Sequence, residues 1–278
     1  MLKKTLISAV FIISIAQLAP ADDETCEILD RVVVTGASVT AGYGVSTPPI
    51  KGDLGAYTIN MKHIMEGVIT LDHEEVAFYG DLMFFNNSKK NARAYIEKIK
   101  LYKPTLVVGV DLLFWFGHGT PPKDCDVPAY RMEKLNYALR LLDELSVPMV
   151  IGNLPNVRDA IGGYLSTSHV PTEKTLQKLN ERIDAWADAH ENVSIIDVHC
   201  LWNKALRDEE IVLQHHTWPI GSRKKLLQED MLHTTLEGTV AASLLVIEAL
   251  GIECLETNLE RIKKNAAAFA RSEDKTEL

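Results

Sequence analysis

Cysteine is scarce in this sequence and is not arranged to bind a metal. The 278 residues contain four cysteines, Cys26, Cys125, Cys200 and Cys254, with no C-x-x-C among them. This is not the spacing of a zinc site, and the histidines have no ligand spacing either. In an oxidising compartment the thiols permit up to two disulfides in three possible pairings, and buried free thiols fit a domain of this size equally well. The sequence therefore predicts no metal and no cofactor, and it leaves the disulfides open.

Long apolar runs are absent beyond the N-terminus, so no later segment is predicted to span a membrane. Residues 1–21 combine two lysines, an apolar run too short to span comfortably, and Ala19-Pro20-Ala21. This pattern predicts a secretory signal peptide that is cleaved after residue 21, with an N-terminal membrane anchor as the alternative. We expect a secreted or periplasmic protein. The last residues, KTEL, are one residue from KDEL, so the endoplasmic reticulum lumen is a second location in a eukaryote.

Basic residues are outnumbered by acidic ones. The chain has 29 Lys and Arg against 38 Asp and Glu, a formal net charge of −9, which becomes −11 once the two lysines of the signal peptide are removed. Such a surface repels nucleic acids and anionic membranes. Linkers and internal repeats are also absent. The sequence indicates one large domain at 22–254, followed by a charged segment at 255–278 that forms a loosely docked helix or a frayed tail.

Apolar, β-branched runs alternate with longer segments of helical periodicity. The runs cover 31–35, 75–79, 105–110, 147–152 and 193–197, and the helical segments cover 54–69, 88–101, 127–145 and 172–190. Continuous apolar strands separated by helices are typical of βαβ units with a parallel sheet that is buried on both faces. The sequence predicts an α/β protein, a three-layer α/β/α sandwich around about five parallel strands.

A final helix is expected after the last predicted strand. Thr234 to Glu237 has the pattern of a capping box, apolar residues follow with helical spacing, and Gly251 stands where a helix would end. In an open parallel sheet, ligands and catalytic groups collect at the carboxyl ends of the strands. The loops after each strand and the loop before this helix are therefore the segments in which to look for a site.

The turn after the first strand, GASVTAGYG at residues 36–44, has two competing interpretations. Short-chain dehydrogenases carry T-G-x-x-x-G-x-G at this place and a later Y-x-x-x-K, and this chain has Thr35-Gly36 together with Tyr130 and Lys134. Five residues separate Gly36 from Gly42, however, where that motif has three, which alters the turn that approaches a pyrophosphate. The dehydrogenase interpretation is kept as a remote alternative.

The second interpretation is that the turn presents Ser38 as a nucleophile. Asp230 and His233 are three residues apart just before the final helix, so the carboxylate can hold one nitrogen of the imidazole and leave the other free. Carboxylate and imidazole are the orienting group and the base that activate a serine hydroxyl for acyl transfer. Ser38, His233 and Asp230 are therefore the candidate catalytic residues.

These segments resemble two sequence blocks of the GDSL, or SGNH, hydrolase family. The turn at 36–44 is similar to the block G-D-S-L-T-x-G-x-G that carries the nucleophile, and Asp230 to His233 is similar to the D-x-x-H of the last block. The resemblance covers roughly residues 31–250 and implies a flavodoxin-like SGNH hydrolase fold. It also implies that Ser38 is the nucleophile, His233 the base and Asp230 its orienter. Gly80 matches a glycine whose backbone N–H would join that of Ser38 in an oxyanion hole.

The sequence departs from the family pattern at two positions. Ala37 replaces an aspartate that mainly braces the turn, and Asp111 stands where an oxyanion-binding asparagine is expected. A lost donor of this kind is worth about 3 to 4 kcal/mol of transition-state stabilisation. Asp111 could be protonated and donate, or it could point elsewhere while Asn86 or Asn87 supplies the donor. Otherwise the site would be inactive, and the fold would serve a non-catalytic binding protein, for example one for carbohydrate.

Three further residues are candidates for substrate binding. Trp115 and Phe116 follow the third strand and could wall an acyl pocket or stack on a sugar, with plain core packing as the alternative. Asn153 follows the fourth strand and would line the same cleft. The sequence predicts an exported serine esterase or acyl hydrolase that acts on a small-molecule, carbohydrate or lipid ester.

Overall fold

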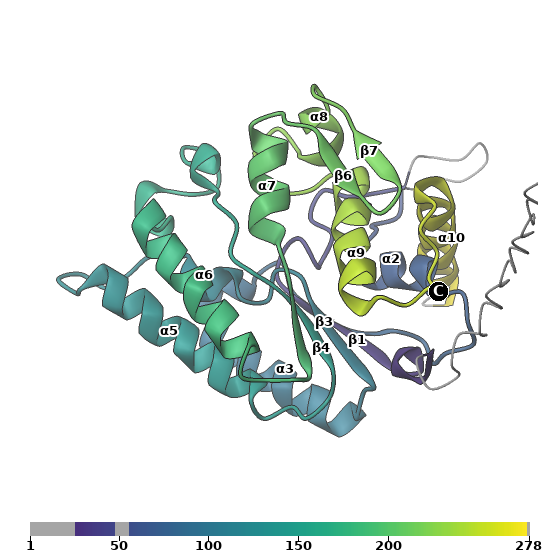
Figure 1. Ribbon diagram of the computed structural model, residues 1–278, viewed down its shortest axis with the longest axis horizontal. Coiled ribbons are helices and arrows are strands. Elements are labelled where there is room, and N and C mark those ends of the chain that lie inside the picture. The colour runs from purple at the N-terminus through teal and green to yellow at the C-terminus, as the bar shows by residue number, and fades with distance from the viewer. Residues whose placement is uncertain (1–25, 48–55, 277–278) are drawn as a thin grey trace, which may run out of the picture.

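A five-stranded parallel sheet forms the centre of the protein (Figure 1). The computed structural model describes residues 26–47 and 56–276; the predicted signal peptide and the last two residues of KTEL lie outside the described residues. The strands are β1 (Val32–Gly36), β2 (Ala77–Gly80), β3 (Leu106–Gly109), β4 (Met149–Gly152) and β5 (Val193–Ile196). Their order is β2-β1-β3-β4-β5, and every pair is parallel. The predicted α/β class and the five strands are confirmed.

Helices cover both faces of the sheet, as Figure 1 shows. One layer contains α3 (Ser88–Tyr102), α5 (Val127–Leu142) and α6 (Glu173–Ala187). The opposite layer contains α2 (Met61–Val68), α7 (Val198–Leu206), α9 (Leu236–Leu250) and α10 (Leu259–Thr276). Shorter elements are α4 (Phe114–Gly117), α8 (Arg223–Leu226) and four 3-10 helices, η1 (Glu27–Leu29), η2 (Phe84–Asn87), η3 (Arg158–Ala160) and η4 (Thr167–His169).

Alternating strand residues supply two separate cores. Val32 and Val34 of β1 pack with α2, α9 and α10, whereas Val33 between them packs with α3, α5 and α6. Successive side chains of a strand point to opposite faces, so a sheet covered on both sides needs apolar residues at every position. This is why β1, β3 and β4 are buried along their whole length.

The strand order distinguishes the dehydrogenase interpretation of the first turn from the hydrolase interpretation. The order β2-β1-β3-β4-β5 is the flavodoxin-like one, with its switch point between β1 and β3. A dinucleotide-binding dehydrogenase sheet would continue past β2 with a further strand in the order 3-2-1-4-5-6. The described sheet therefore does not support the dehydrogenase alternative, and Tyr130 and Lys134 are residues of helix α5.

The C-terminal elements differ from the prediction in detail. The N-cap of helix α9 is Thr235, one residue later than the Thr234 of the predicted capping box. The Thr235 hydroxyl accepts a hydrogen bond from the Gly238 N–H at 3.2 Å. Glu237 does not reach back to the cap; its carboxylate accepts from Trp218 Nε1 and from Lys263. The segment expected as a loose helix or frayed tail contains α10, which packs on α2 through Ile262, 0% exposed.

A small antiparallel hairpin was not predicted. Strands β6 (Ile211–Leu213) and β7 (His216–Trp218) form it beside α7 and α9. Along the chain, the hairpin and α8 follow α7 and precede the loop that carries Asp230 and His233. Its three-residue strands are too short to produce a clear alternating pattern in the sequence.

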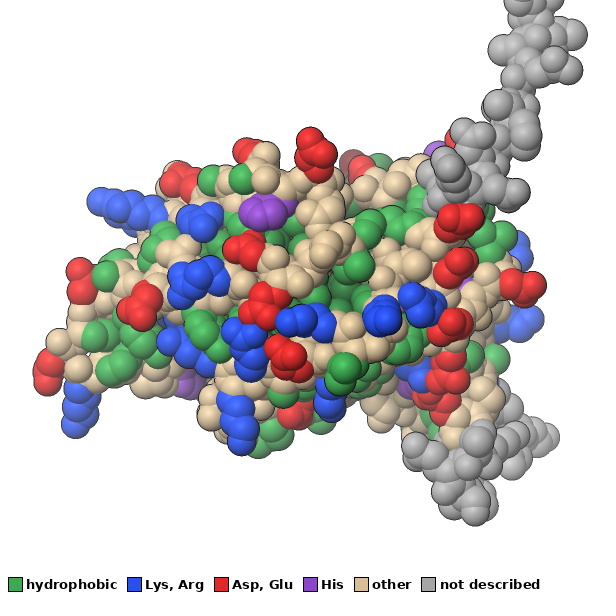
Figure 2. Space-filling view, turned by 90° about the horizontal axis from the view of Figure 1, so that it is seen from below, with side chains coloured by type: hydrophobic (Ala, Val, Ile, Leu, Met, Phe, Trp, Pro, Cys, Tyr) green, Lys and Arg blue, Asp and Glu red, His purple; other side chains and the backbone are tan. Residues whose placement is uncertain are grey.

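Charges of both signs are mixed on the surface. On the face drawn in Figure 2, lysine and arginine side chains lie among aspartates and glutamates, although the chain as a whole is acidic. Within residues 26–47 and 56–276, none of the helices has the length and apolar character needed to cross a bilayer.

Candidate active site

Ser38 lies on a tight turn at the carboxyl end of β1. Backbone hydrogen bonds from Ala41 N to Ala37 O (2.8 Å) and from Tyr43 N to Ser38 O (2.9 Å) close the turn. Gly42 adopts φ +73°, and a Cβ there would lie 2.0 Å from the Ile59 carbonyl oxygen. Only glycine fits this position, because other residues would meet both backbone strain and a backbone clash. The turn therefore holds the serine side chain at the edge of the sheet.

Asp111, two residues after the end of β3, holds this turn in place. Its carboxylate accepts hydrogen bonds from Ala37 N (2.9 Å), Val39 N (2.8 Å) and Thr40 N (3.4 Å), and from Thr40 Oγ1 (2.6 Å). A Cβ on Gly36 would lie 2.2 Å from Asp111 Oδ1, so glycine at position 36 makes room for the carboxylate. Asp111 is therefore not placed as an oxyanion donor. It supplies from β3 the bracing carboxylate that Ala37 lacks.

The same bracing leaves one backbone donor available. Asp111 accepts from the N–H groups on either side of Ser38, but within the described residues the Ser38 N–H has no acceptor. Gly80 ends the neighbouring strand β2 and pairs in register with Gly36, two residues before the serine. A free backbone N–H beside a nucleophile is the donor that an oxyanion hole requires.

Asp230 and His233 lie on the loop before α9. Met231 adopts φ +56°, a left-handed conformation that turns the chain back between them. Asp230 Oδ1 accepts from the backbone N–H groups of Leu232 and His233, each at 2.9 Å, and Oδ2 accepts from His233 Nδ1 at 2.7 Å. Burial alone would raise the pKa of Asp230, but the hydrogen bonds from His233 and Leu232 outweigh it and hold that pKa below its usual value. The carboxylate fixes the imidazole ring and its tautomer.

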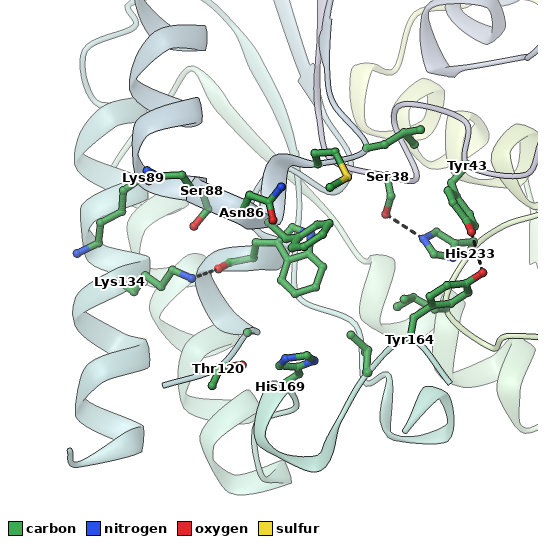
Figure 3. Close-up of a pocket in the computed structure, with 18 of the residues that line it drawn as sticks. Ser38, Tyr43, Asn86, Ser88, Lys89, Thr120, Lys134, Tyr164, His169 and His233 are labelled. Carbon is green, nitrogen blue, oxygen red and sulfur yellow. Dashed lines mark hydrogen bonds between the residues drawn. The ribbon is translucent and has the colours of Figure 1, made fainter. Parts of the chain in front are cut away.

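Ser38 and His233 meet across the edge of the sheet (Figure 3). Ser38 Oγ donates to His233 Nε2 at 3.0 Å, although 195 residues separate them in the sequence. His233 is 5% exposed, and Tyr43 covers its ring, with centroids 4.3 Å apart. The three predicted catalytic residues therefore form one hydrogen-bonded chain from carboxylate to imidazole to hydroxyl.

Two residues that the sequence did not point to hold this arrangement together. Gln228 Nε2 donates to the Tyr43 carbonyl (2.6 Å) and to the Thr234 carbonyl (2.7 Å), so it links the serine turn to the histidine loop. The Tyr164 hydroxyl is 2.7 Å from that of Tyr43, and its ring meets His233 edge-on at 5.8 Å. Neither residue lies in a recognisable motif, and only their spatial position reveals their role.

A cleft of about 880 Å³ opens in front of Ser38. It is lined by residues of the β1 turn, the β2–α3 segment, α4, α5, the β4–α6 segment and the histidine loop, among them Met83, Phe85, Asn86, Trp115, Lys134 and Tyr164. Trp115, a predicted substrate-binding residue, contributes to its wall. Asn86 faces the cleft (Figure 3), whereas the Asn87 side chain, which also borders the cleft, caps α3 by accepting from Lys90 N at 3.3 Å.

Two predicted substrate-binding residues do not border this cleft. Phe116 is 0% exposed and packs in the core against Phe84, so the alternative of plain core packing holds for it. Asn153 uses its side chain to donate to Asp197 Oδ1 (2.9 Å) and to accept from His199 N (2.7 Å). It thereby joins β4 to the start of α7 and touches only a small apolar pocket of about 20 Å³ beside Ser38.

Metal-binding clusters are not found in the part of the chain that the structure describes: no group of three or more His, Cys, Asp or Glu side chains there could hold an ion. The described cysteines are free, and Cys26 and Cys254 approach one another, with Sγ atoms 3.0 Å apart.

Comparison with solved structures confirms the fold. A protein assigned as a GDSL-like lipase, from Parabacteroides merdae, matches 80% of this chain and 96% of its own at a TM-score of 0.50 and 13% identity. A gut microbial diltiazem-metabolizing enzyme matches 80% of this chain at a TM-score of 0.51 and 11% identity, and the match spans 47% of that enzyme's length. A GDSL-like lipase from Bacteroides thetaiotaomicron shares 15% identity, with coverages of 80% and 88% and a TM-score of 0.48.

The chain has the α/β fold of GDSL-like lipases, as the sequence resemblance implied. The sequence itself matches no protein-family model and no curated protein.

Proposed function

We propose that the protein is a serine hydrolase that cleaves carboxylic esters with Ser38, His233 and Asp230. The observation that carries this proposal is the unbroken chain of hydrogen bonds from Asp230 through His233 to Ser38, which ends at a cleft large enough for a small-molecule ester. Singly, each residue has an ordinary structural explanation. Together, in a fold shared with GDSL-like lipases, they form the orienter, base and nucleophile that acyl transfer needs.

Acylation would begin with proton transfer. His233 Nε2 takes the proton of Ser38 Oγ as the oxygen attacks the ester carbonyl, and the ionised Asp230 stabilises the imidazolium that forms. The tetrahedral intermediate collapses when His233 returns this proton to the departing alcohol. Water then enters and attacks the acyl carbonyl as His233 takes its proton, and His233 returns this proton to Ser38 Oγ as the carboxylic acid leaves.

The oxyanion needs donors other than Asp111, which accepts four hydrogen bonds and has none to give. We assign the Ser38 N–H as the first donor, since no described residue accepts from it. The Gly80 N–H and the Asn86 amide would complete the hole. Gly80 ends the adjacent strand, and the Asn86 side chain faces the cleft without a hydrogen-bond partner among the described residues.

The sequence alone supports our proposal for the setting of the reaction. The proposed enzyme is exported by its signal peptide and acts without a cofactor in a secreted or periplasmic location, or in the endoplasmic reticulum lumen of a eukaryote. Its partners are small-molecule, carbohydrate or lipid esters, and its acidic net charge argues against nucleic acid.

One observation favours a second candidate, a non-catalytic binding protein on the same fold. The position at which the family carries an oxyanion-binding asparagine is occupied by Asp111, so β3 supplies no side-chain donor. In this alternative the cleft would bind a ligand, such as a carbohydrate, without cleaving it.

Fluorophosphonate labelling separates the two candidates. A functional triad attacks phosphorus through Ser38 Oγ, expels fluoride and leaves a stable adduct that mass spectrometry places on Ser38. We expect no adduct in Ser38→Ala and slow labelling in His233→Ala, with kcat on a short acyl ester lowered about 10⁴-fold or more in either variant. Ser166→Ala, an exposed serine outside the triad, is the matched control. Absence of labelling in the folded wild-type protein would exclude the esterase and support the binding protein.

A further inference from the structure

Positive side chains gather at the end of the cleft away from Ser38. Figure 3 shows Ser38 and His233 on one side of the cleft and Lys89 and Lys134 on the other. Lys89 lies in the first turn of α3, and Lys134 is in the middle of α5. Both residues line this end of the cleft, and the Lys89 ammonium lies 5.2 Å from the centre of the Tyr137 ring on α5.

Lys134 is a partly buried cation without an anionic partner. Its ammonium donates to the Trp115 carbonyl and lies 5.9 Å from the centre of the Phe116 ring. Within residues 26–47 and 56–276, no carboxylate lies within ion-pair distance of it. Other partly buried lysines differ, since Lys62 contacts Glu75 and Glu273, and Lys263 contacts Glu237. A buried charge is normally paired, so the unpaired one calls for an explanation.

The surroundings of Lys134 are cationic as well. Arg131, 2% exposed, donates to the carbonyls of Gly117 and Ser168 and also lacks a carboxylate within ion-pair distance in the described part of the chain. Burial, reinforced by the positive charges of Arg131 and Lys89, lowers the pKa of Lys134 to about 8. Lys134 at the far end of the cleft therefore lies near two further positive charges, in a protein whose net charge is −9.

The wall between the two ends is largely apolar. Trp115 packs against Phe85, with ring centroids 5.4 Å apart, and Met83 and Phe85 are 51% and 47% exposed. Exposed apolar side chains of this size that gather in a cleft mark a surface for an apolar ligand. A molecule that fills the cleft would meet the serine first, then apolar side chains, then positive charge.

We propose that Lys134 and Lys89 form a binding site for an anionic oxygen group, a carboxylate or a phosphate, of the substrate. The inference rests on the proposed function in one respect, because it makes the substrate an ester whose reacting carbonyl is joined by an apolar segment to an anionic end. The ammonium of Lys134 has three N–H groups, and the Trp115 carbonyl is its one acceptor among the described residues, so donors remain for a ligand. Charge-assisted hydrogen bonds of this kind are among the strongest in proteins.

Binding to a protein that cannot react tests the site independently of catalysis. In Ser38→Ala, calorimetry should show octanoate and octyl phosphate binding at least about tenfold more tightly than 1-octanol, the contribution of one charged hydrogen bond. Lys134→Met, which keeps side-chain length, should abolish this preference. Lys89→Met should reduce it, and Lys134→Arg should retain part of it. The exposed Lys178 on α6 provides the control, and Lys178→Met should bind as the parent does.

The comparison of octanoate with octyl phosphate identifies which anion the site takes. Equal affinities for 1-octanol and for both anions would overturn the proposal, as would an anion preference that persists in both Lys134→Met and Lys89→Met. If Lys134→Met does not fold, as judged by circular dichroism, the preference of the Ser38→Ala parent and the Lys89→Met result still decide the matter.

Kinetics then link the site to the reaction. The para-nitrophenyl monoester of a medium-length dicarboxylic acid should have a kcat/KM at least about tenfold above that of its neutral methyl-capped counterpart, mainly through KM, and Lys134→Met should equalise the two. Anion binding without hydrolysis of any ester would refute the esterase and leave the anion site standing. Hydrolysis with no anion preference in either assay would refute the anion site and leave the esterase standing.

Discussion

At the scale of single residues, Asp111 was a predicted member of the oxyanion hole, and the structure instead places its carboxylate under the serine turn. In the sequence alone, an aspartate in place of the family's asparagine predicts a damaged oxyanion hole. In the structure it accepts from three backbone N–H groups and a hydroxyl of the serine turn, which only a carboxylate with its acceptor oxygens can do. The signal that could have suggested this was Ala37, because a missing brace at one position invites a replacement from a neighbouring strand.

Asp111→Asn should therefore impair the protein. The new amide group would direct N–H donors at backbone N–H donors. We expect the free energy of unfolding, measured with urea, to fall by about 1 to 3 kcal/mol. Fluorophosphonate labelling of Ser38 should also become slower. Asp159→Asn, at an exposed position, should leave both unchanged. Faster labelling in Asp111→Asn would mean that the carboxylate repels the oxyanion.

Lys134 should destabilise the folded state because its charge is partly buried without an anionic partner. A pKa of about 8 against an ordinary 10.5 corresponds to at most about 3 kcal/mol, and water in the cleft reduces this figure. Below pH 8 the lysine is charged in both the folded and the unfolded state, so the full cost is present. Between pH 8 and 10.5 the folded state releases its proton first, and the cost disappears.

We therefore expect Lys134→Met to be more stable than wild type at pH 7. Its free energy of unfolding, measured with urea, should be about 1 to 3 kcal/mol higher. The difference should shrink as the pH rises from 8 to 10.5. Lys178→Met controls for loss of a surface charge. A difference that is constant from pH 7 to 10.5 would assign the effect to packing instead of charge.

At the scale of elements, the connection between two loops decides whether the catalytic groups meet. The β1 turn carries Ser38 and the loop before α9 carries His233, and the Gln228 side chain donates to both segments. Gly44 allows this approach, because a Cβ there would lie 2.6 Å from Gln228 Oε1. Gln228 is a positioning residue, since it touches neither the reacting hydroxyl nor the imidazole.

Gln228→Ala should lower kcat about 10- to 100-fold and leave KM nearly unchanged, because a displacement of the base by about 1 Å has an effect of this size. Steady-state kinetics on a short acyl ester provide the measurement. Gln177→Ala, on the exposed face of α6, is the matched control. A rise in KM at constant kcat would instead place Gln228 in substrate binding.

The two ends of the domain are also brought together. Cys26 precedes η1 and Cys254 follows α9, and their Sγ atoms are 3.0 Å apart. Exchange with oxidised glutathione should join them: each thiol loses a proton, the two sulfurs bond, and glutathione is reduced. Peptide mapping under non-reducing conditions should find this pair, with Cys125 and Cys200 alkylated, and the free energy of unfolding should rise by about 2 to 4 kcal/mol. Any other pairing would contradict the geometry.

The elements show what local pattern predicts and what it misses. All five strands fall within a few residues of their predicted positions, because β-branched runs bounded by turn residues have few alternatives. The cap of α9 shifted by one residue, since two adjacent threonines offer equivalent hydroxyls and Glu237 is used by Lys263. The β6–β7 hairpin was missed because three-residue strands are fixed by their contacts with α7 and α9, which the sequence does not display.

At the scale of the whole molecule, the candidate site was predictable where it depended on chain order and fold. Strand ends on one edge of a parallel sheet bring Ser38 near the loop before the last helix, and the motifs supply the residue types. The lining of the cleft was not predictable in this way. Trp115 and Phe116 are neighbours in a short helix, yet one borders the cleft and the other is buried in the core, a distinction set by the packing of Phe84.

The C-terminal helix α10 is held to the rest of the domain by close packing. The Ile262 side chain is 0% exposed, and a Cβ on Gly67 of α2 would lie 2.7 Å from the Ile262 carbonyl oxygen, so the two helices approach closely. Glu273 adds contacts to Lys62 and His63. The charged composition of this segment suggested a loose tail, because the apolar stripe of Ile262 and three alanines is narrow.

Ile262→Ala should therefore destabilise the whole domain and not merely detach its end. Removal of a fully buried isoleucine side chain costs about 2 to 5 kcal/mol, and α10 covers α2, which in turn packs on β1 beside the serine turn. We expect one cooperative urea transition at lower midpoint, followed in parallel by circular dichroism and by the rate of fluorophosphonate labelling of Ser38. Lys264→Ala, on the exposed side of α10, should unfold as wild type does. If Ile262→Ala lost helix content without losing Ser38 reactivity, α10 would be an independent appendage, and the catalytic edge of the sheet would not depend on it.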